Sequence, residues 1–179
     1  MVDGFYAKKT QFSTEESKQT MQTMIDWENA AWKKNDDTTA KETAELIKTH
    51  ASFTSTIKRN PSLQDIKDEL DEQHPVIALV NMYALYQEPA SGDSYHVLVI
   101  TGYDEAKQEF IVQDPARKEA TRRAYSTLMQ SLHDFNPTSK EADGVPTVLF
   151  TGPHTSSGIS QFFQWISLVF KRLFSTTSL

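Results

Sequence analysis

The sequence contains two apolar runs, Tyr95-His96-Val97-Leu98-Val99-Ile100-Thr101-Gly102-Tyr103-Asp104 and Glu109-Phe110-Ile111-Val112-Gln113-Asp114-Pro115, separated by the polar residues 105–108. Runs of β-branched and aromatic residues on either side of a short polar turn predict an antiparallel hairpin. In such a hairpin the start of the first strand lies beside the end of the second. His96 and Asp114 are therefore expected to lie together at one edge of a sheet. An imidazole beside a carboxylate supplies the base and the orienting group of a nucleophilic site.

Each of these two residues also has a structural interpretation. A histidine that begins a buried strand is often a satisfied core residue, and an aspartate before proline can cap a turn through a backbone N–H. Their expected adjacency favours the catalytic interpretation, because an acceptor on one ring nitrogen fixes the tautomer of a buried histidine. A metal site needs three or four ligands, and only these two residues converge. We therefore expect no metal and no cofactor.

The composition indicates one domain and excludes several classes of site. The chain has 179 residues, of which 38% are hydrophobic, and this is enough for one buried core. The net charge of −6 argues against a nucleic-acid partner, because phosphate binding requires a dense basic patch. Cations gather only at residues 117–123, where Glu119 interrupts them. The absence of cysteine excludes disulfides, thiolate metal sites and a cysteine nucleophile within this chain.

Helical patterns precede the strands along the chain. Two capping boxes, Ser13 with Glu16 and Thr39 with Glu42, predict the starts of two helices. The first of these helices carries apolar residues at helical spacing, which we assign to the core: Met21, Met24, Ile25, Trp27 and Trp32.

The remaining pattern completes an α+β domain. A helix is expected over residues 63–70 and another after a cap at Ser126, with an apolar side that extends to Phe135. Besides the hairpin, strands are expected at 53–57, 76–80, 122–125 and 147–150, and residues 81–94 are expected to be irregular. Helices followed by such strands indicate N-terminal helices packed on a mostly antiparallel sheet.

The C-terminal region is predicted to lie outside this domain. Residues 1–150 form the domain, 151–158 a linker, and 159–174 an amphipathic helix with Phe162, Phe163, Ile166 and Phe170 on one side. About 16 residues span roughly 24 Å, less than the ~30 Å hydrocarbon core of a bilayer. A spanning helix is therefore not expected. Peripheral membrane contact, dimerisation and docking on the domain all remain open for Ile159–Phe174.

The order of these motifs resembles the bacterial peptidase C39-like family, which has the papain-like cysteine peptidase fold. The resemblance covers residues 1–150 and is carried by the hairpin together with residues 61–70, His74-Pro75-Val76-Ile77 and Tyr125-Ser126-Thr127-Leu128-Met129. It implies that His96 is the general base, that Asp114 orients it, and that the substrate is a peptide or isopeptide. It also implies an exported or cell-surface protein, although residues 1–6 lack the features of a signal peptide.

The nucleophile of that family, a cysteine on an N-terminal helix, has no counterpart in this sequence. In the resemblance, the helix that carries this cysteine would end near Met1-Val2-Asp3-Gly4. Because this sequence lacks that helix, we expect the residues it would cover, Phe5, Tyr6 and Met21, to be poorly covered. No Gly-x-Ser-x-Gly pattern nominates a serine instead. Three explanations remain open: the full protein has a preceding cysteine-bearing segment, the domain is a non-catalytic relative that binds peptides or partners, or it is an unrelated binding domain. We expect no thiol-dependent hydrolysis by the chain as it stands.

Overall fold

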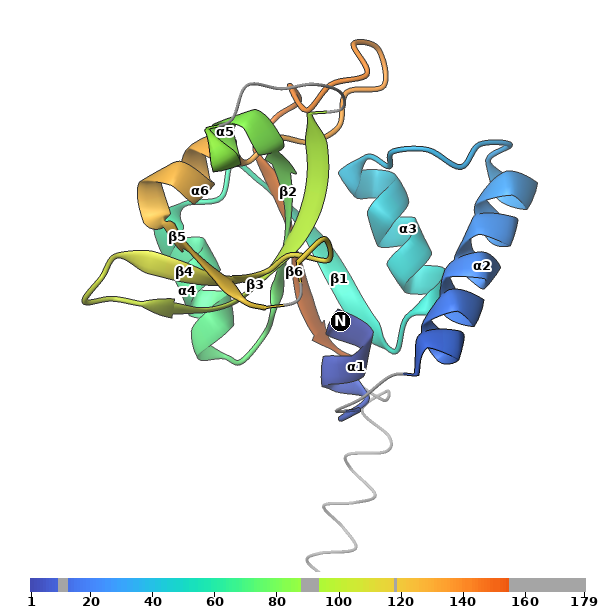
Figure 1. The fold of residues 1–179 in the computed structure, drawn as a ribbon, viewed down its shortest axis with the longest axis horizontal. Coiled ribbons are helices and arrows are strands. Elements are labelled where there is room, and N and C mark those ends of the chain that lie inside the picture. Colours follow the sequence, from blue (N-terminus) through green and yellow to red (C-terminus); the bar gives the residue numbers. More distant parts are fainter. Residues whose placement is uncertain (10–12, 88–93, 118, 155–179) are drawn as a thin grey trace, which may run out of the picture.

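The computed structural model describes residues 1–9, 13–87, 94–117 and 119–154 (Figure 1). The helices are α1 (Val2–Tyr6), α2 (Thr14–Ala31), α3 (Ala40–His50), α4 (Leu63–Asp71), α5 (Met82–Tyr86) and α6 (Tyr125–Ser131). The strands are β1 (Phe53–Arg59), β2 (Val76–Asn81), β3 (Tyr95–Asp104), β4 (Glu109–Gln113), β5 (Thr121–Ala124) and β6 (Thr147–Pro153). The expected α+β class is confirmed.

All the strands belong to one six-stranded sheet in the order β1-β6-β2-β3-β4-β5. Every neighbouring pair is antiparallel, and β6 is inserted between β1 and β2. Strand β2 lies near the middle of the sheet, and residues 76–80 are buried on both of its faces. An antiparallel strand is apolar on both faces only when both faces are covered.

Helices cover the two faces of the sheet and enclose two clusters of buried side chains. Successive residues of a strand point to opposite faces, so Val76, Ala78 and Val80 join one cluster while Ile77 and Leu79 join the other. The first cluster packs against α4, α5 and α6, and the second packs against α1 and α3 (Figure 1). The predicted packing of N-terminal helices on the sheet therefore holds for α1 and α3.

Helix α2 begins as the sequence predicts, but its assignment to the core was wrong. The Ser13–Glu16 capping box is present, yet the only buried residue of the helix is Glu28. Met21 is 56% exposed. Met24, Ile25, Trp27 and Trp32 are only half-buried. The reason is that α2 lies outside α3 and does not reach the strands, so its apolar side borders an open groove instead of a closed core (Figure 1).

The expected poor cover near the N-terminus is largely confirmed. Phe5 is 51% exposed and Met21 is 56% exposed. Tyr6 is better covered than expected, because its ring stacks on Phe53 at a centroid distance of 5.4 Å. Its hydroxyl also lies 2.9 Å from Oγ1 of Thr151.

Three local assignments differ from the sequence-based prediction. Ser126 does not cap α6, which begins at Tyr125 without a side-chain cap and ends at Ser131, so Leu132 and Phe135 are buried without being helical. The segment after β2 contains α5, capped by the Asn81 side chain. Residues 151–153, which we assigned to the linker, extend β6 because they pair with β1.

The rest of the predicted C-terminal region, residues 155–174, lies outside the described residues. Its linker, its amphipathic helix and its possible contacts therefore stay predictions. Within the described ranges, no helix has the length and apolar character needed to cross a membrane.

Candidate active site

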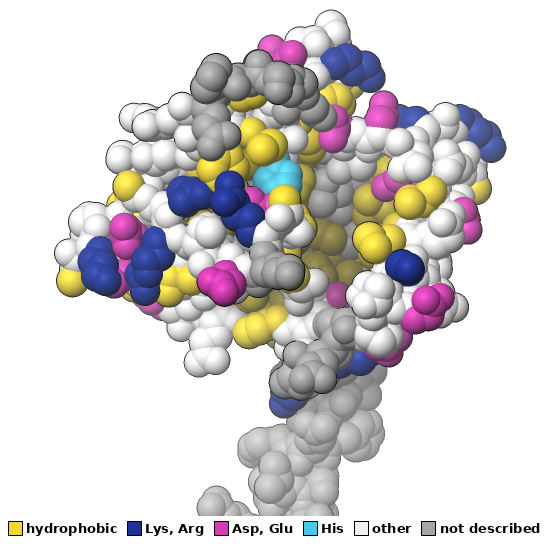
Figure 2. Space-filling view, in the orientation of Figure 1, with side chains coloured by type: hydrophobic (Ala, Val, Ile, Leu, Met, Phe, Trp, Pro, Cys, Tyr) yellow, Lys and Arg dark blue, Asp and Glu magenta, His cyan; other side chains and the backbone are white. Residues whose placement is uncertain are grey.

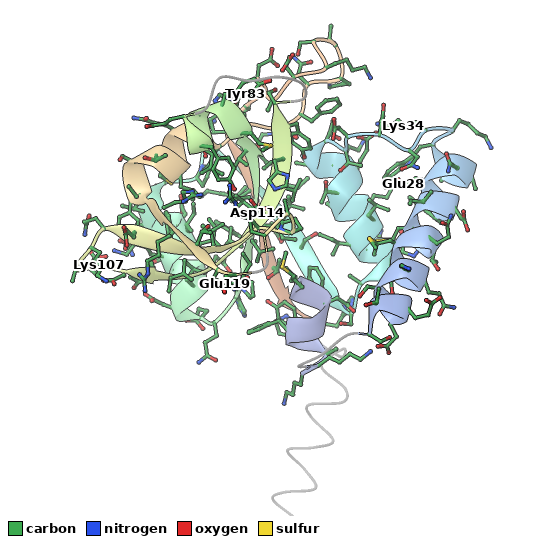
Figure 3. All side chains as sticks on the ribbon, in the orientation of Figure 1. Glu28, Lys34, Tyr83, Lys107, Asp114 and Glu119 are labelled. Carbon is green, nitrogen blue, oxygen red and sulfur yellow. The ribbon has the colours of Figure 1, made fainter. Side chains whose placement is uncertain are left out.

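The hairpin β3–β4 brings His96 and Asp114 together as predicted. His96 is the second residue of β3, and Asp114 directly follows β4. The register pairs Val99 with Gln113 and Ile100 with Val112, which places both residues at the open end of the hairpin. Nε2 of His96 lies 2.8 Å from Oδ1 of Asp114. Figure 3 shows Asp114 inside the molecule and Lys107, in the turn of the hairpin, at its periphery.

Asp114 is buried and accepts hydrogen bonds on both carboxylate oxygens. Its side chain is 2% exposed. The backbone N–H of Ala116 donates to Oδ1 over 2.8 Å, and the Tyr86 hydroxyl donates to Oδ2. Nε of Arg117 lies 3.6 Å from Oδ2. The carboxylate therefore has the partners that a buried charge requires.

These contacts fix the charge state of Asp114. Burial alone would raise its pKa, but the hydrogen bonds from Tyr86, His96 and the Ala116 backbone outweigh burial and hold the pKa below its usual value. The same contacts act in the opposite direction on the phenol. Burial and the hydrogen bond to Asp114 raise the pKa of Tyr86, although Arg117 and Arg123 partly oppose this rise. Asp114 is thus an anion that holds the imidazole.

The hydrogen bond to Asp114 also determines which histidine nitrogen is available. Because Asp114 is ionised, Nε2 of His96 is the nitrogen that carries the proton, and in the neutral ring Nδ1 is then the basic nitrogen. No described residue hydrogen-bonds to Nδ1. The His96 side chain is 20% exposed. The ring is therefore oriented by one nitrogen and can accept a proton on the other.

An apolar groove runs beside the dyad. It has a volume of about 350 Å³, and Figure 2 shows a hollow between the sheet and the helical layer of α2 and α3. Val97 and Pro115, the sequence neighbours of the two dyad residues, both line it. Other lining residues come from all the surrounding elements, including Val2 of α1, Met24 of α2, Ile47 of α3 and Ile77 of β2.

The sequence did not reveal Tyr86 as part of this site. Tyr86 lies at the end of α5, in a segment that we expected to be irregular. Two signals could have indicated it. Asn81 is a residue type that caps helices, and the Met82-Tyr83-Ala84-Leu85-Tyr86 run that follows is free of helix breakers. A buried carboxylate also requires several donors, and the histidine supplies only one.

Three other histidines, His74, His133 and His154, do not form a comparable site. Nδ1 of His74 lies 3.1 Å from Oε2 of Glu69, where both side chains are 28% exposed. His133 bonds to the backbone oxygen of Gly144, and His154 to that of Ala51. In the described part of the chain, no group of three His, Cys, Asp or Glu residues could hold a metal ion.

The state of Asp114 predicts acid-sensitive stability. Its folded pKa lies below the ordinary value of 3.8, so its contribution is fully present above pH 3.8 and is lost as the pH falls through the folded pKa. We expect the free energy of unfolding to decrease below about pH 4, and Asp114→Asn to reduce this decrease. Urea unfolding between pH 2 and pH 7 measures both.

Part of the acid sensitivity should survive in that variant. Hydrogen bonds from Lys9 and Ser13 lower the pKa of Glu16 to about 2. Hydrogen bonds from the Ser62 backbone and hydroxyl lower the pKa of Asp65 to about 2. An unchanged pH dependence in Asp114→Asn would contradict the assigned ionisation of Asp114.

Comparison with known proteins agrees with the sequence motifs. No curated protein matches the chain. A crystal structure from Bacillus anthracis, described as that of a C39-like peptidase, aligns with a TM-score of 0.46 and 11% identity. The alignment covers 65% of this chain and 60% of that one, so the chain spans about 60% of the length of this solved relative. The model of the Peptidase_C39 like family matches residues 1–143, and the chain belongs to this family.

Proposed function

We propose that His96 and Asp114 are the base and the orienting residue of a papain-like cysteine peptidase site whose thiol lies outside these 179 residues. The observation that carries the proposal is the contact of 2.8 Å between Nε2 of His96 and Oδ1 of Asp114, which leaves Nδ1 without a described partner. Membership of the Peptidase_C39 like family supports it.

The proposed chemistry uses the dyad at each proton transfer. Nδ1 of His96 takes the thiol proton, and the thiolate attacks the carbonyl carbon of a peptide or isopeptide bond. The imidazolium then donates this proton to the leaving amine as the C–N bond breaks, and a thioester remains. In the second half, His96 takes a proton from water, whose oxygen attacks the thioester, and the proton returns to the thiolate. Asp114 stabilises the imidazolium in both halves.

The apolar groove supports the position that this chemistry requires for the thiol. Val97 and Pro115 flank the dyad in sequence and line the groove together with Met1 and Val2. A helical segment that precedes Val2 and fills the groove would pass close to Val97 and Pro115, the sequence neighbours of the dyad residues. It would also cover Met24 and Ile47, which now border the open volume.

This proposal is tested by comparing the present chain with a longer product of the same reading frame. The chain of 179 residues has no thiol, so we expect no iodoacetamide-sensitive hydrolysis of a fluorogenic peptide mixture. A product that begins upstream of Met1 and includes a cysteine should hydrolyse the mixture, and its Cys→Ser variant should not. An upstream sequence without cysteine, or an inactive longer product, would contradict the peptidase proposal.

A non-catalytic peptide-binding domain is the second candidate, favoured by the absence of cysteine from the chain. The groove and the partly exposed His96 would then contact the peptide. Binding to an immobilised peptide library should be measurable with the present chain, and His96→Ala should weaken it. If no peptide binds, or if the variant binds equally well, this candidate is wrong.

A further inference from the structure

A second pocket is lined by Tyr86, whose hydroxyl contacts Asp114, and it has a different character from the groove. It has a volume of about 470 Å³. It is formed by α5, β5, the start of α6 and the turn after Asp114, and none of the described residues that line it is acidic. Its polar lining residues are Tyr86, Gln87, Arg117, Arg122, Arg123 and Thr127.

Three arginines gather at this pocket in a chain whose net charge is −6. Arg122 is paired with Asp104 at 3.3 Å and with Glu109 at 3.8 Å. Arg117 approaches Asp114 at 3.6 Å. Arg123 forms no ion pair with any described carboxylate. It donates a hydrogen bond of 2.8 Å to the Arg122 backbone oxygen, and its guanidinium also acts on the Tyr86 phenol. Within the described residues, the charge of Arg123 is therefore not paired with a carboxylate.

Arg123 also has unused hydrogen-bonding capacity. Its Nε is buried and has no hydrogen-bond partner within the described residues. Its guanidinium carbon lies 4.8 Å from the centre of the Tyr86 ring, the same distance as that of Arg117. A buried donor without a partner is costly, and a planar guanidinium held against an aromatic ring is well placed to bind a carboxylate through two N–H groups.

The pocket is connected to the dyad through shared side chains. The Tyr86 hydroxyl donates to Asp114, and the Tyr86 ring lines the pocket. Arg117 likewise contacts Asp114 and lines the pocket. A ligand group bound here would thus be separated from the His96–Asp114 pair by a single side chain, which is the placement of a specificity pocket.

We propose that this pocket binds a carboxylate of the peptide ligand, with Arg123 as the principal contact. The ligand is a peptide because of the proposed function, and this inference rests on that function for the identity of the ligand alone. The carboxylate can belong to an acidic side chain or to a free C-terminus, since both present the same planar group to a guanidinium.

The test uses small probes that have no bond for the site to cleave. N-acetylglutamic acid amide carries a side-chain carboxylate, N-acetylglutamine carries a terminal carboxylate, and N-acetylglutamine amide is a neutral match for both. Titrations of the 179-residue chain, followed by the NMR resonances of the arginine Nε–H groups and of Tyr86, report binding. We expect saturable shifts with one or both acids and none with the neutral amide, and the stronger acid identifies the source of the carboxylate.

Two variants assign the binding to Arg123. Arg123→Gln should weaken the affinity for the acidic probe at least about tenfold, because it removes a charge-assisted pair of hydrogen bonds. Arg59→Gln is the matched control, since Arg59 is exposed at the end of β1, the strand at the opposite edge of the sheet, and it should leave the affinity unchanged.

Several results would overturn the inference. Equal shifts with acidic and neutral probes on the unaltered chain would do so without any variant. Unchanged affinity in a folded Arg123→Gln protein would also overturn the inference. Tighter binding of inorganic phosphate than of either acid would overturn it too, because the pocket would then be a phosphate site. Because the probes are not cleaved, loss of this inference would leave the peptidase proposal standing, and an inactive longer chain would leave the carboxylate pocket standing.

Discussion

In a longer form of the domain that carries the thiol, His96→Ala should lower kcat/KM for peptide hydrolysis by about 10²–10⁴-fold. The reason is that Nε2 of His96 is held by Asp114 at 2.8 Å, so the ring is positioned to exchange protons at Nδ1. Without the imidazole, neither the thiol nor the leaving amine has a proton partner. Initial rates with a fluorogenic peptide at several substrate concentrations measure the loss.

His74→Ala is the control for this variant, because His74 is also paired with a carboxylate. Nδ1 of His74 lies 3.1 Å from Oε2 of Glu69, remote from the hairpin end. The control should change kcat/KM less than about threefold, since surface substitutions seldom act beyond their own contacts. A His96→Ala enzyme that retained more than about a tenth of the activity would show that another group acts as the base.

Asp114→Ala should lower the free energy of unfolding by about 3 kcal/mol, because it removes a buried carboxylate and leaves three partly buried donors without their acceptor. The Tyr86 hydroxyl, Nε2 of His96 and the Ala116 backbone N–H would all lose their partner. Urea unfolding at pH 7 measures this loss. The pKa of Tyr86 should fall at the same time, since the bond to Asp114 contributes, after burial, to its raised value.

A second tyrosine–aspartate pair provides the control. The Tyr103 hydroxyl donates to Oδ1 of Asp71 over 2.8 Å in an exposed position. Asp71→Ala should cost less than about 1 kcal/mol, because water replaces the lost acceptor at the surface. Equal losses in the two variants would mean that burial of Asp114 does not make its hydrogen bonds more important.

The sequence was sufficient to predict the dyad because the hairpin is local. Two apolar runs and the short polar turn between them determine which ends of β3 and β4 lie together, so His96 and Asp114 could be placed at one edge from spacing alone. The capping boxes at Ser13 and Thr39 were also local, and both are present. The family followed from the order of these motifs.

The features that the sequence did not reveal depend on tertiary position. Nothing in the periodicity of α2 indicates that it lies outside α3, which is why Met24 and Ile25 were assigned to the core and are only half-buried. Tyr86 reaches Asp114 only because α5 folds back over the sheet after β2. The proximity of Arg117 and Arg123 likewise requires β5 to pair with β4. In the sequence, Glu119 lies between the two arginines, so they did not indicate a cationic site.

The position of the dyad within a single hairpin has a consequence for how the domain folds. The loop that must close to join His96 and Asp114 spans 18 residues, so its entropic cost is small compared with that of joining residues from distant parts of the chain. A hairpin that pairs first at its turn reaches its open end last. We therefore expect the contact between His96 and Asp114 to form as the last step of local hairpin pairing. By contrast, β6 pairs with β1 and β2, which are far from it in the sequence. The contact between His96 and Asp114 thus depends on local pairing, whereas the sheet is completed by the long-range pairing of β6 with β1 and β2.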